Sequence, residues 1–219
     1  MDTNPSKPVK RDPEATRRRI LEAATDQFSR FGLAGARVDA ISEVAGSNER
    51  MLYYYFGSKE LLYVAVLESM YKDFARKESS LDLTGLAPRD AIATLAQSIW
   101  TYFWDSPQWL SLINNENLHQ GRYLKASDKL NDAISPLVEV IQSILERGAD
   151  AGQFRRGVDP LDFYLTLIGM GYYIASNRYT IDAFTGRDYV QLADRQRIAA
   201  MHAEMLLAFL RPPTIDQAG

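Results

Sequence analysis

The sequence predicts an all-α fold with nine or ten helices. Apolar side chains recur at intervals of three and four residues along most of the chain, which is the spacing of one face of an α-helix. No segment shows a convincing alternation of apolar and polar residues, the pattern of a half-buried strand. Glycines, prolines and capping residues divide the apolar pattern into separate helices. We therefore expect a set of distinct helices without a sheet.

The first expected helix opens at Pro13, with Asp12 as its cap, and ends at Gly32 and Gly35. Its apolar face consists of Ile20, Ala23, Ala24, Phe28 and Phe31. A short second helix ends at Gly46. The apolar residues of this helix, expected to pack on the first helix, are Val38, Ile41, Val44 and Ala45.

Two capping residues open the next expected helices. Asn48 is a suitable cap for a third short helix over 48–55, and Ser58 for a longer fourth helix. The fourth helix continues through the apolar positions Val66, Leu67 and Met70. Residues 1–12 are polar and contain two prolines without a helical period, so we expect a disordered basic arm, with an inert tail as the alternative.

The chain stays helical after a polar break at 78–89. Segments 91–104 and 107–118 are expected to be helices, and a stripe of apolar residues runs from Leu130 to Leu145. Pro136 lies inside this stripe, which predicts a kink there or a helix start at Ser135. Asp159 caps a further helix over the 160s and 170s. The last helix ends at two prolines, and its apolar residues are Ile198, Met201, Met205, Leu206 and Phe209.

Composition excludes several classes of protein. The 219 residues are 46% hydrophobic and 24% charged, which is ordinary for a globular protein. The absence of cysteine excludes disulfides, thiolate metal sites and thiol nucleophiles. No secretory signal or membrane-length apolar run is evident, so we expect a cytoplasmic protein that does not enter a membrane. The net charge is −3, but the first 20 residues hold six basic and three acidic side chains, which allows a basic end on an acidic body.

Residues 37–62, RVDAISEVAGSNERMLYYYFGSKELL, carry the functional signal. Two short helices joined by a tight glycine turn are typical of a helix-turn-helix. Gly46 permits the corner, and Leu52 and Phe56 are expected to anchor the second helix inward. The opposite face would then be free to enter a major groove and reach the base edges.

The stretch from Ile20 to Leu62 resembles the DNA-binding domain of the tetracycline-repressor (TetR) family. The resemblance is carried by RRRILEAATDQFSRFG, AISEVAGSNERMLYYYF and GSKELL in consecutive order, and by the run Tyr53, Phe56, Lys59 and Leu62. The later segment GADAGQFRRGVDP also looks like a loop found in many members. The resemblance implies a transcriptional regulator, usually a repressor, that a small molecule releases from a palindromic operator.

The resemblance also implies a domain organisation. Residues 13–57 would form the helix-turn-helix domain, 58–213 an effector-binding and dimerisation domain, and 214–219 a tail. In this family the last two main helices of two subunits form a four-helix interface. The stripe on the last helix fits that use, with internal core as the competing interpretation. The implied partners are double-stranded DNA, a small effector and a second copy of the chain.

The candidate DNA-binding residues follow from matching positions in the family motif. They are Arg37, Val38, Asn48, Glu49, Arg50, Met51, Tyr53, Tyr54, Tyr55 and Lys59. Arg50 is suited either to bidentate bonding of guanine or to clamping a phosphate. Glu49 either accepts from a cytosine amine or favours the helix N-terminus.

The three consecutive tyrosines cannot all face inward, since they span about 200° of a helix. A phenol hydroxyl that faces outward is a good phosphate donor, while tyrosines that face inward would be core. Lys59 would contact phosphate at the start of the fourth helix, the alternative being a solvated lysine. Arg37, Val38 and Ser47 depart from the residues common in the family, so the operator sequence does not follow from the motif.

The C-terminal part is rich in aromatic residues, which predicts either an ordinary core or a cavity for a small effector. This effector would be aromatic or apolar, with a weakly acidic compound as one alternative. The candidate effector-binding residues are Trp100, Phe103, Trp104, Trp109, Asn117, His119, Phe163, Leu167, Met170 and Tyr173. Further polar residues nearby are Asn114, Asn115 and Arg178. His202 is expected at an interface or the surface.

No cofactor, metal or catalytic residue is expected. Glu116 and His119 share a helix face, but a metal site needs further ligands, and none is evident. The alternative function is that of an all-helical enzyme using the aromatic cavity. No nucleophile–base pair, phosphate loop or metal motif supports it.

Overall fold

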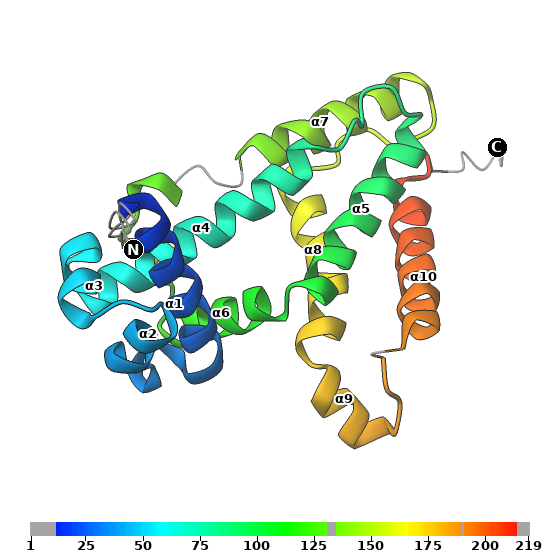
Figure 1. Ribbon diagram of the computed structural model, residues 1–219. Helices are drawn as coiled ribbons and strands as arrows, with labels where there is room; N and C mark the ends of the chain where they lie inside the picture. Colours follow the sequence, from blue (N-terminus) through cyan, green and yellow to red (C-terminus); the bar gives the residue numbers. More distant parts are fainter. Residues whose placement is uncertain (1–11, 131–134, 190, 214–219) are drawn as a thin grey trace, which may run out of the picture.

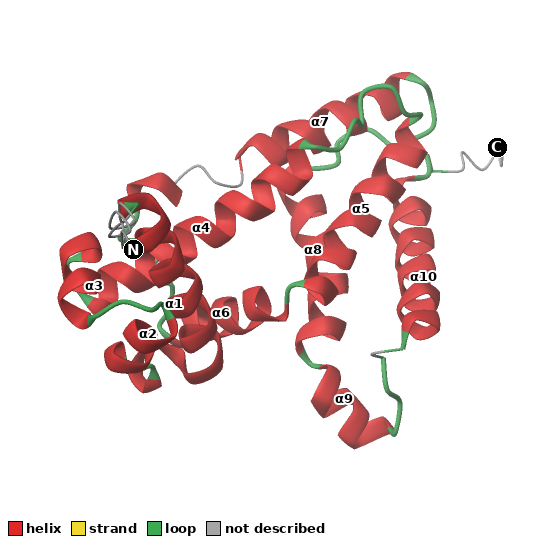
Figure 2. Cartoon of the chain, in the orientation of Figure 1, coloured by secondary structure: helices red, strands yellow, loops and turns green. Residues whose placement is uncertain are grey.

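We describe the chain from a computed structural model, which covers residues 12–130, 135–189 and 191–213. These ranges contain ten α-helices and one short 3-10 helix, η1 (Asp128–Leu130), and no strand (Figure 2). The all-α prediction is confirmed. The predicted N-terminal arm, apart from Asp12, and the predicted tail lie outside the described residues.

Four helices make up the N-terminal end of the molecule: α1 (Pro13–Gly35), α2 (Val38–Val44), α3 (Glu49–Phe56) and α4 (Lys59–Ser79). Their predicted caps are present. The side chains of Asp12, Asn48 and Ser58 accept hydrogen bonds from the backbone N–H groups of Glu14, Met51 and Leu61 respectively. These bonds satisfy donors that the first turn of each helix leaves free.

The remaining helices form the body. They are α5 (Pro88–Asp105), α6 (Pro107–Leu118), α7 (Ser135–Asp150), α8 (Pro160–Ser176), α9 (Arg178–Thr185) and α10 (Leu192–Leu210). Figure 1 shows α4 leaving the N-terminal unit and running toward α7, while α5, α8 and α10 lie side by side. Helix α6 returns from the body and packs against α1. Helix α9 projects away from the body between α8 and α10.

The centre of the body is packed closely around Trp100. Its indole Nε1 donates a hydrogen bond to the Leu167 carbonyl oxygen at 2.9 Å, joining α5 to α8. A Cβ added at Gly171 would lie 1.9 Å from Trp100 Cδ1, so a residue without a side chain is required at this crossing. His202 of α10 packs on the same indole, with ring centroids 5.4 Å apart, so the expectation of an interface or surface position for this histidine was wrong.

Three further details of the structure differ from the sequence prediction. Val44 is 67% exposed, because the buried face of α2 consists of Ile41, Ser42 and Ala45, and Val44 points to another side of this short helix. Phe31 is exposed beneath Arg30 instead of completing the apolar face of α1. The short helix α9 was not anticipated.

Two other details were settled. Of the two alternatives at Pro136, the structure has the helix start, since α7 begins at Ser135. Residues 131–134 of the apolar stripe lie outside the described part of the chain. Gly32 has φ 66° and ψ 177°, so α1 is interrupted at the glycine where the sequence predicted its end.

Candidate DNA interface and effector region

Helix α3 is attached to the N-terminal unit through one side. Leu52 is fully buried and Phe56 nearly so, as the sequence predicted, and Arg17 of α1 lies over the Phe56 ring at 5.0 Å. The turn before α3 is formed by Gly46, whose φ of 58° is favourable only for glycine. Arg19 of α1 donates to the Ala45 carbonyl oxygen, which holds this turn against the first helix.

The opposite side of α3 faces solvent. Glu49, Arg50, Tyr53 and Tyr54 are exposed, Tyr54 by 77%. Their spacing of one, three and one places them together on one face of an α-helix. No hydrogen bond or ion pair within the described chain engages the Arg50 guanidinium, so its donors are free for another molecule.

Three candidate residues near the turn have partners within the chain. Asn48 Oδ1 accepts from the Met51 N–H and caps α3, which directs the oxygen toward the helix and leaves the amide N–H donors for DNA. Arg37 forms an ion pair with Asp39, which raises the pKa of Arg37 and lowers the pKa of Asp39. Val38 is half-buried and packs against the core, so little of its side chain reaches the surface.

The last DNA-binding candidates surround the exposed face. Met51 and Tyr55 are half-buried, and the Tyr55 ring meets the Tyr54 ring edge to face at 5.2 Å. Lys59 lies in the first turn of α4, where its Nζ donates to the Ala34 carbonyl oxygen at 3.4 Å. The predicted residues thus gather along α3 and the two helix starts beside it.

The candidate effector-binding residues, in contrast, are not brought to one place. Trp100 and Leu167 belong to the packed crossing of α5 and α8. Trp104 is covered by Arg195 of α10, whose Cζ lies 4.4 Å from the ring centroid. Asn117 and Tyr173 are exposed, and His119 packs on Tyr123. Phe163 and Met170 line a separate hollow of about 580 Å³ beside α10.

Phe103 and Trp109 do belong to a common aromatic cluster. Their rings lie 5.2 Å apart, and Trp109 also contacts Phe74 at 5.5 Å, Tyr102 at 6.1 Å and Tyr71 at 6.3 Å. Tyr71 and Phe74 of α4 belong to this cluster but were not among the predicted effector-binding residues. Their spacing of three was the available signal, since it places them on one helix face.

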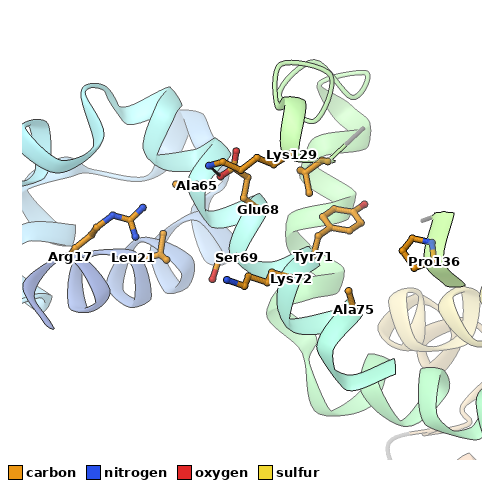
Figure 3. Close-up of a pocket in the computed structure, with 11 residues that line it drawn as sticks. Arg17, Leu21, Ala65, Glu68, Ser69, Tyr71, Lys72, Ala75, Lys129 and Pro136 are labelled. Atoms are coloured by element: carbon orange, nitrogen blue, oxygen red, sulfur yellow. Dashed lines mark hydrogen bonds and ion pairs between the residues drawn. The ribbon is translucent and has the colours of Figure 1, made fainter. Parts of the chain in front are cut away.

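A groove separates the N-terminal unit from the body. It has a volume of about 570 Å³ and is bordered by α1, α4, η1 and Pro136 of α7. Figure 3 shows Glu68 and Lys129 meeting above it, where their ion pair measures 2.7 Å. Tyr71 points from α4 toward the side on which Pro136 lies. The groove therefore reaches the aromatic cluster at Tyr71.

Two sets of contacts join the cluster region to the N-terminal unit. Glu116 of α6 is buried, and its Oε1 accepts from the backbone N–H groups of Tyr123 and Leu124. The Tyr123 ring contacts Tyr63 of α4 at 5.3 Å, and Tyr63 contacts Phe28 of α1 at 5.1 Å. Hydrogen bonds and packed rings therefore form a continuous set of contacts from α6 to α1.

The second contact is direct. A Cβ added at Gly32 of α1 would lie 2.8 Å from Asn115 Oδ1 of α6, so the two helices meet closely at the glycine. The N-terminal unit, which contains α3, and the body therefore share a packed boundary rather than a loose linker.

One side of the body exposes apolar side chains from two helices. They are Leu161, Leu165 and Tyr173 of α8 and Met201, Met205 and Phe209 of α10. Ile198, the remaining residue of the predicted stripe, is half-buried. Among the described residues, no three His, Cys, Asp or Glu side chains are grouped to hold a metal ion. None of the described helices combines the length and apolar character needed to cross a membrane.

Helix α3 is buried on one side and exposed on the other, and it belongs to a small unit that packs against a helical body. This arrangement defines the class of protein as a helix-turn-helix DNA-binding regulator. Comparison with known proteins agrees. Residues 20–66 match the family model for bacterial regulatory proteins of the tetR family, and residues 88–206 match a tetracyclin repressor-like C-terminal domain. The chain belongs to the TetR family of transcriptional regulators.

Similar proteins and structures extend the match over most of the chain. The transcriptional repressor NicS of Pseudomonas putida is 39% identical over 183 residues, covering 84% of this chain and 85% of NicS. The repressor AcnR of Corynebacterium efficiens is 28% identical and covers 73% of this chain and 81% of AcnR. A tetR-family protein from Rhodococcus RHA1 has the same fold, with a TM-score of 0.69, 18% identity and coverage of 90% of this chain and 97% of that one. These relatives are regulators, so the alternative of an all-helical enzyme is set aside.

Proposed function

We propose that this protein is a repressor that binds a palindromic operator as a dimer and is released by a small aromatic effector. The exposed face of α3 carries the proposal. Leu52 and Phe56 hold the helix in place, while Arg50, Tyr53 and Tyr54 are free to meet DNA. The names of the relatives NicS and AcnR, both transcriptional repressors, support repression over activation.

Each residue of this face has a role in the proposal. Arg50 reads a base through its guanidinium, since an arginine can bond both O6 and N7 of guanine. The Tyr53 and Tyr54 hydroxyls and Lys59 contact phosphates and set the orientation of the helix. Arg37 lies at the start of α2 and is assigned a phosphate contact, for which its guanidinium would exchange Asp39 for the phosphate. The remaining candidates, Asn48, Glu49, Met51 and Tyr55, are assigned to the rim of the contact, and Val38 packs beneath it.

The dimer is proposed to form through α8 and α10. Their exposed apolar side chains would be covered by the same surface of a second copy, as two-fold symmetry requires. Met205 is 53% exposed and lies at the middle of this face beside Phe209. Two copies of α3 held in this way would enter successive major grooves, about 34–36 Å apart.

Release is proposed to follow a shift of population. An effector in the body would favour an arrangement of α4 and α6 in which the two α3 helices no longer match the operator. Affinity for DNA then falls by the ratio of effector affinities for the two arrangements. The contacts from Glu116 through Tyr63 to Phe28, and from Asn115 to Gly32, are the proposed connection. Because its target is chromosomal DNA, we expect the regulator to act in the cytoplasm.

In vitro selection from random duplexes, followed by footprinting, tests the proposal. We expect an inverted repeat whose half-site centres lie about one helical turn apart. Met205→Glu should yield monomers in sedimentation experiments and lose the two-fold footprint, because a charge is then placed in an apolar contact. A single asymmetric site bound by a monomer would contradict the proposed architecture.

A further inference from the structure

The groove between the N-terminal unit and the body carries more positive than negative charge. Its charged lining residues are Arg17 of α1, Glu68 and Lys72 of α4 and Lys129 of η1. Glu68 is fully engaged, because its two carboxylate oxygens accept from Ser127 Oγ at 2.8 Å and from Lys129 Nζ at 2.7 Å. Although burial alone would raise the pKa of Glu68, these two bonds lower it, so the carboxylate is ionised and neutralises Lys129.

The other two cations of the groove have no anionic partner. Within the described residues, no hydrogen bond or ion pair engages the Arg17 guanidinium or the Lys72 ammonium. Arg17 has only an aromatic contact, since its Cζ lies 5.0 Å from the centroid of the Phe56 ring. In Figure 3, Arg17 extends from α1 and the nitrogen of Lys72 points from α4 toward the side on which α1 lies. Two positive charges from different helices thus line one groove without a counterion, and an anion placed there would be attracted by both.

The rest of the lining is mainly apolar. Apart from Ser69, it consists of Leu21, Ala65, Tyr71, Ala75, Leu130 and Pro136. In the view of Figure 3, Tyr71 and Pro136 lie on the side away from Arg17, so the groove has a positive end and an apolar end. Its volume of about 570 Å³ is within the range of small-molecule sites. A ligand that matches this lining combines an anionic group with an apolar ring or chain.

We propose that this groove binds an aromatic carboxylate, whose anionic group pairs with Arg17 and Lys72 while its ring lies against Tyr71. The inference rests on the proposed function, because it assigns the site and the chemical class of the effector. A weakly acidic effector was one alternative left open by the sequence, and the charge of this groove selects it. The same charge disfavours a cationic ligand.

Arg17 connects this groove to the DNA-facing helix. Phe56 anchors α3, and the Arg17 guanidinium lies over its ring. A charge-assisted hydrogen bond to a carboxylate is stronger than an exposed cation–π contact, so a bound carboxylate would draw the guanidinium away from Phe56. The ligand would also touch both α1 and Pro136 of α7, and so bridge the N-terminal unit and the body. Binding of the carboxylate and binding of the operator then oppose each other, as release requires.

Three probes separate the charge of the ligand from its apolar part: naphthoate as the aromatic carboxylate, naphthamide as its neutral form and inorganic phosphate as an anion without a ring. Calorimetry on the full-length protein measures their binding at low salt. Naphthoate should bind about ten times more tightly than either of the other two. In Lys72→Gln and in Arg17→Gln, naphthoate affinity should fall about fivefold or more, because each change removes one of the two charges, whereas naphthamide affinity should hardly change.

The matched control is Arg18→Gln, which removes one positive charge from an exposed residue of α1 that does not line the groove. It should leave naphthoate affinity as it was. Lys72 is exposed, so Lys72→Gln should keep the Tm of the free protein. Three results would each overturn the inference: an equal loss of naphthoate affinity in Arg18→Gln, undiminished naphthoate binding in Lys72→Gln, or naphthoate binding no tighter than that of naphthamide or phosphate.

Gel shifts with the selected operator distinguish failure of this inference from failure of the proposed function. If the unaltered protein binds its operator but not naphthoate, the regulator stands and the assigned site is wrong. If it binds no operator, the proposed function itself has failed, whereas calorimetry still decides whether the groove binds the carboxylate.

The expected result is that naphthoate releases the operator from the unaltered protein, and that Lys72→Gln requires about five times more naphthoate for release. Arg17→Gln should bind the operator more weakly even without naphthoate, because Phe56 then loses its cationic contact. Naphthoate that binds in the groove without weakening operator binding would overturn its assignment as the effector class.

Discussion

The boundary between the DNA-facing unit and the body depends on one glycine. Gly32 has φ 66° and ψ 177°, a combination that is essentially restricted to glycine, and it lies against Asn115 of α6. Gly32→Ala therefore perturbs both the backbone of α1 and the contact between the two units. We expect this substitution to destabilise the folded protein and to shift α6 relative to α1.

The magnitude follows from two contributions. The backbone conformation costs about 1–3 kcal/mol for a residue with a Cβ. The new Cβ would lie 2.8 Å from Asn115 Oδ1, so the Asn115 side chain must turn away and give up the 2.9 Å hydrogen bond from its Nδ2 to the Ser111 carbonyl oxygen. Losing that bond costs about 1 kcal/mol. The expected total is a decrease of roughly 2–4 kcal/mol in the free energy of unfolding.

Urea unfolding at a fixed protein concentration measures the effect, since a dimer's stability depends on concentration. A double-mutant cycle with Asn115→Ala separates the two contributions. The double variant should be more stable than additivity predicts by about 1 kcal/mol, because the steric contact is then absent. The matched control is Gly35→Ala, three residues further along, where φ is not positive and the nearest atom, Phe31 Cβ, lies 3.3 Å away.

A Gly32→Ala variant as stable as the unaltered protein would refute the role assigned to Gly32. This role would also be refuted if Gly35→Ala were equally destabilising, because the effect would then not depend on the positive φ. If the effects of Gly32→Ala and Asn115→Ala on the free energy of unfolding were additive, the contact with Asn115 would contribute nothing and only the backbone cost would remain.

Three other predictions concern the DNA interface and the core. Arg50→Ala should weaken operator binding roughly 5- to 150-fold for each half-site and leave non-specific binding nearly unchanged. Gel-shift titrations with the operator and with an unrelated duplex would measure the two affinities, and an equal loss of both would mean that Arg50 contacts a phosphate. Leu52→Ala should lower the free energy of unfolding by about 2–5 kcal/mol, since the side chain is fully buried; a change below this range in urea would contradict its role as the anchor of α3. Burial beside Trp100 lowers the pKa of His202 below the value of about 6.5 that it has in the unfolded chain. As the pH falls below about 6.5, the unfolded chain is protonated at His202 before the folded protein is, so the folded protein loses stability. His202→Gln should flatten the dependence of Tm on pH between about pH 7.5 and about pH 5.5. An unchanged slope would mean that other titratable groups cause this pH dependence.

Local signals in the sequence account for the helices and for the DNA-facing unit. Caps such as Asn48 and Ser58, the turn glycine Gly46 and the anchors Leu52 and Phe56 act within a few residues of one another, so their effects can be derived from spacing. Helical spacing also predicted that the three consecutive tyrosines could not all face inward, and the resemblance to the family motif placed Arg50 and Tyr54 on the side that meets DNA. Helix α2 has seven residues and only about two turns, so its apolar spacing does not fix a single buried face. Val44 was therefore predicted to be buried, although it lies on the exposed side.

The tertiary structure decided how the body uses its aromatic residues. Trp100 and Trp109 look alike in the sequence, yet the Trp100 N–H donates to the Leu167 carbonyl oxygen, whereas the Trp109 N–H has no acceptor among the described residues. Rings of α4, α5, α6 and α8 that lie far apart in the chain meet around Phe103, and neither periodicity nor composition specifies which helix faces will meet. A helix sequence determines its own apolar face through local spacing, whereas the burial and pairing of a single polar atom depend on packing between helices distant in the chain.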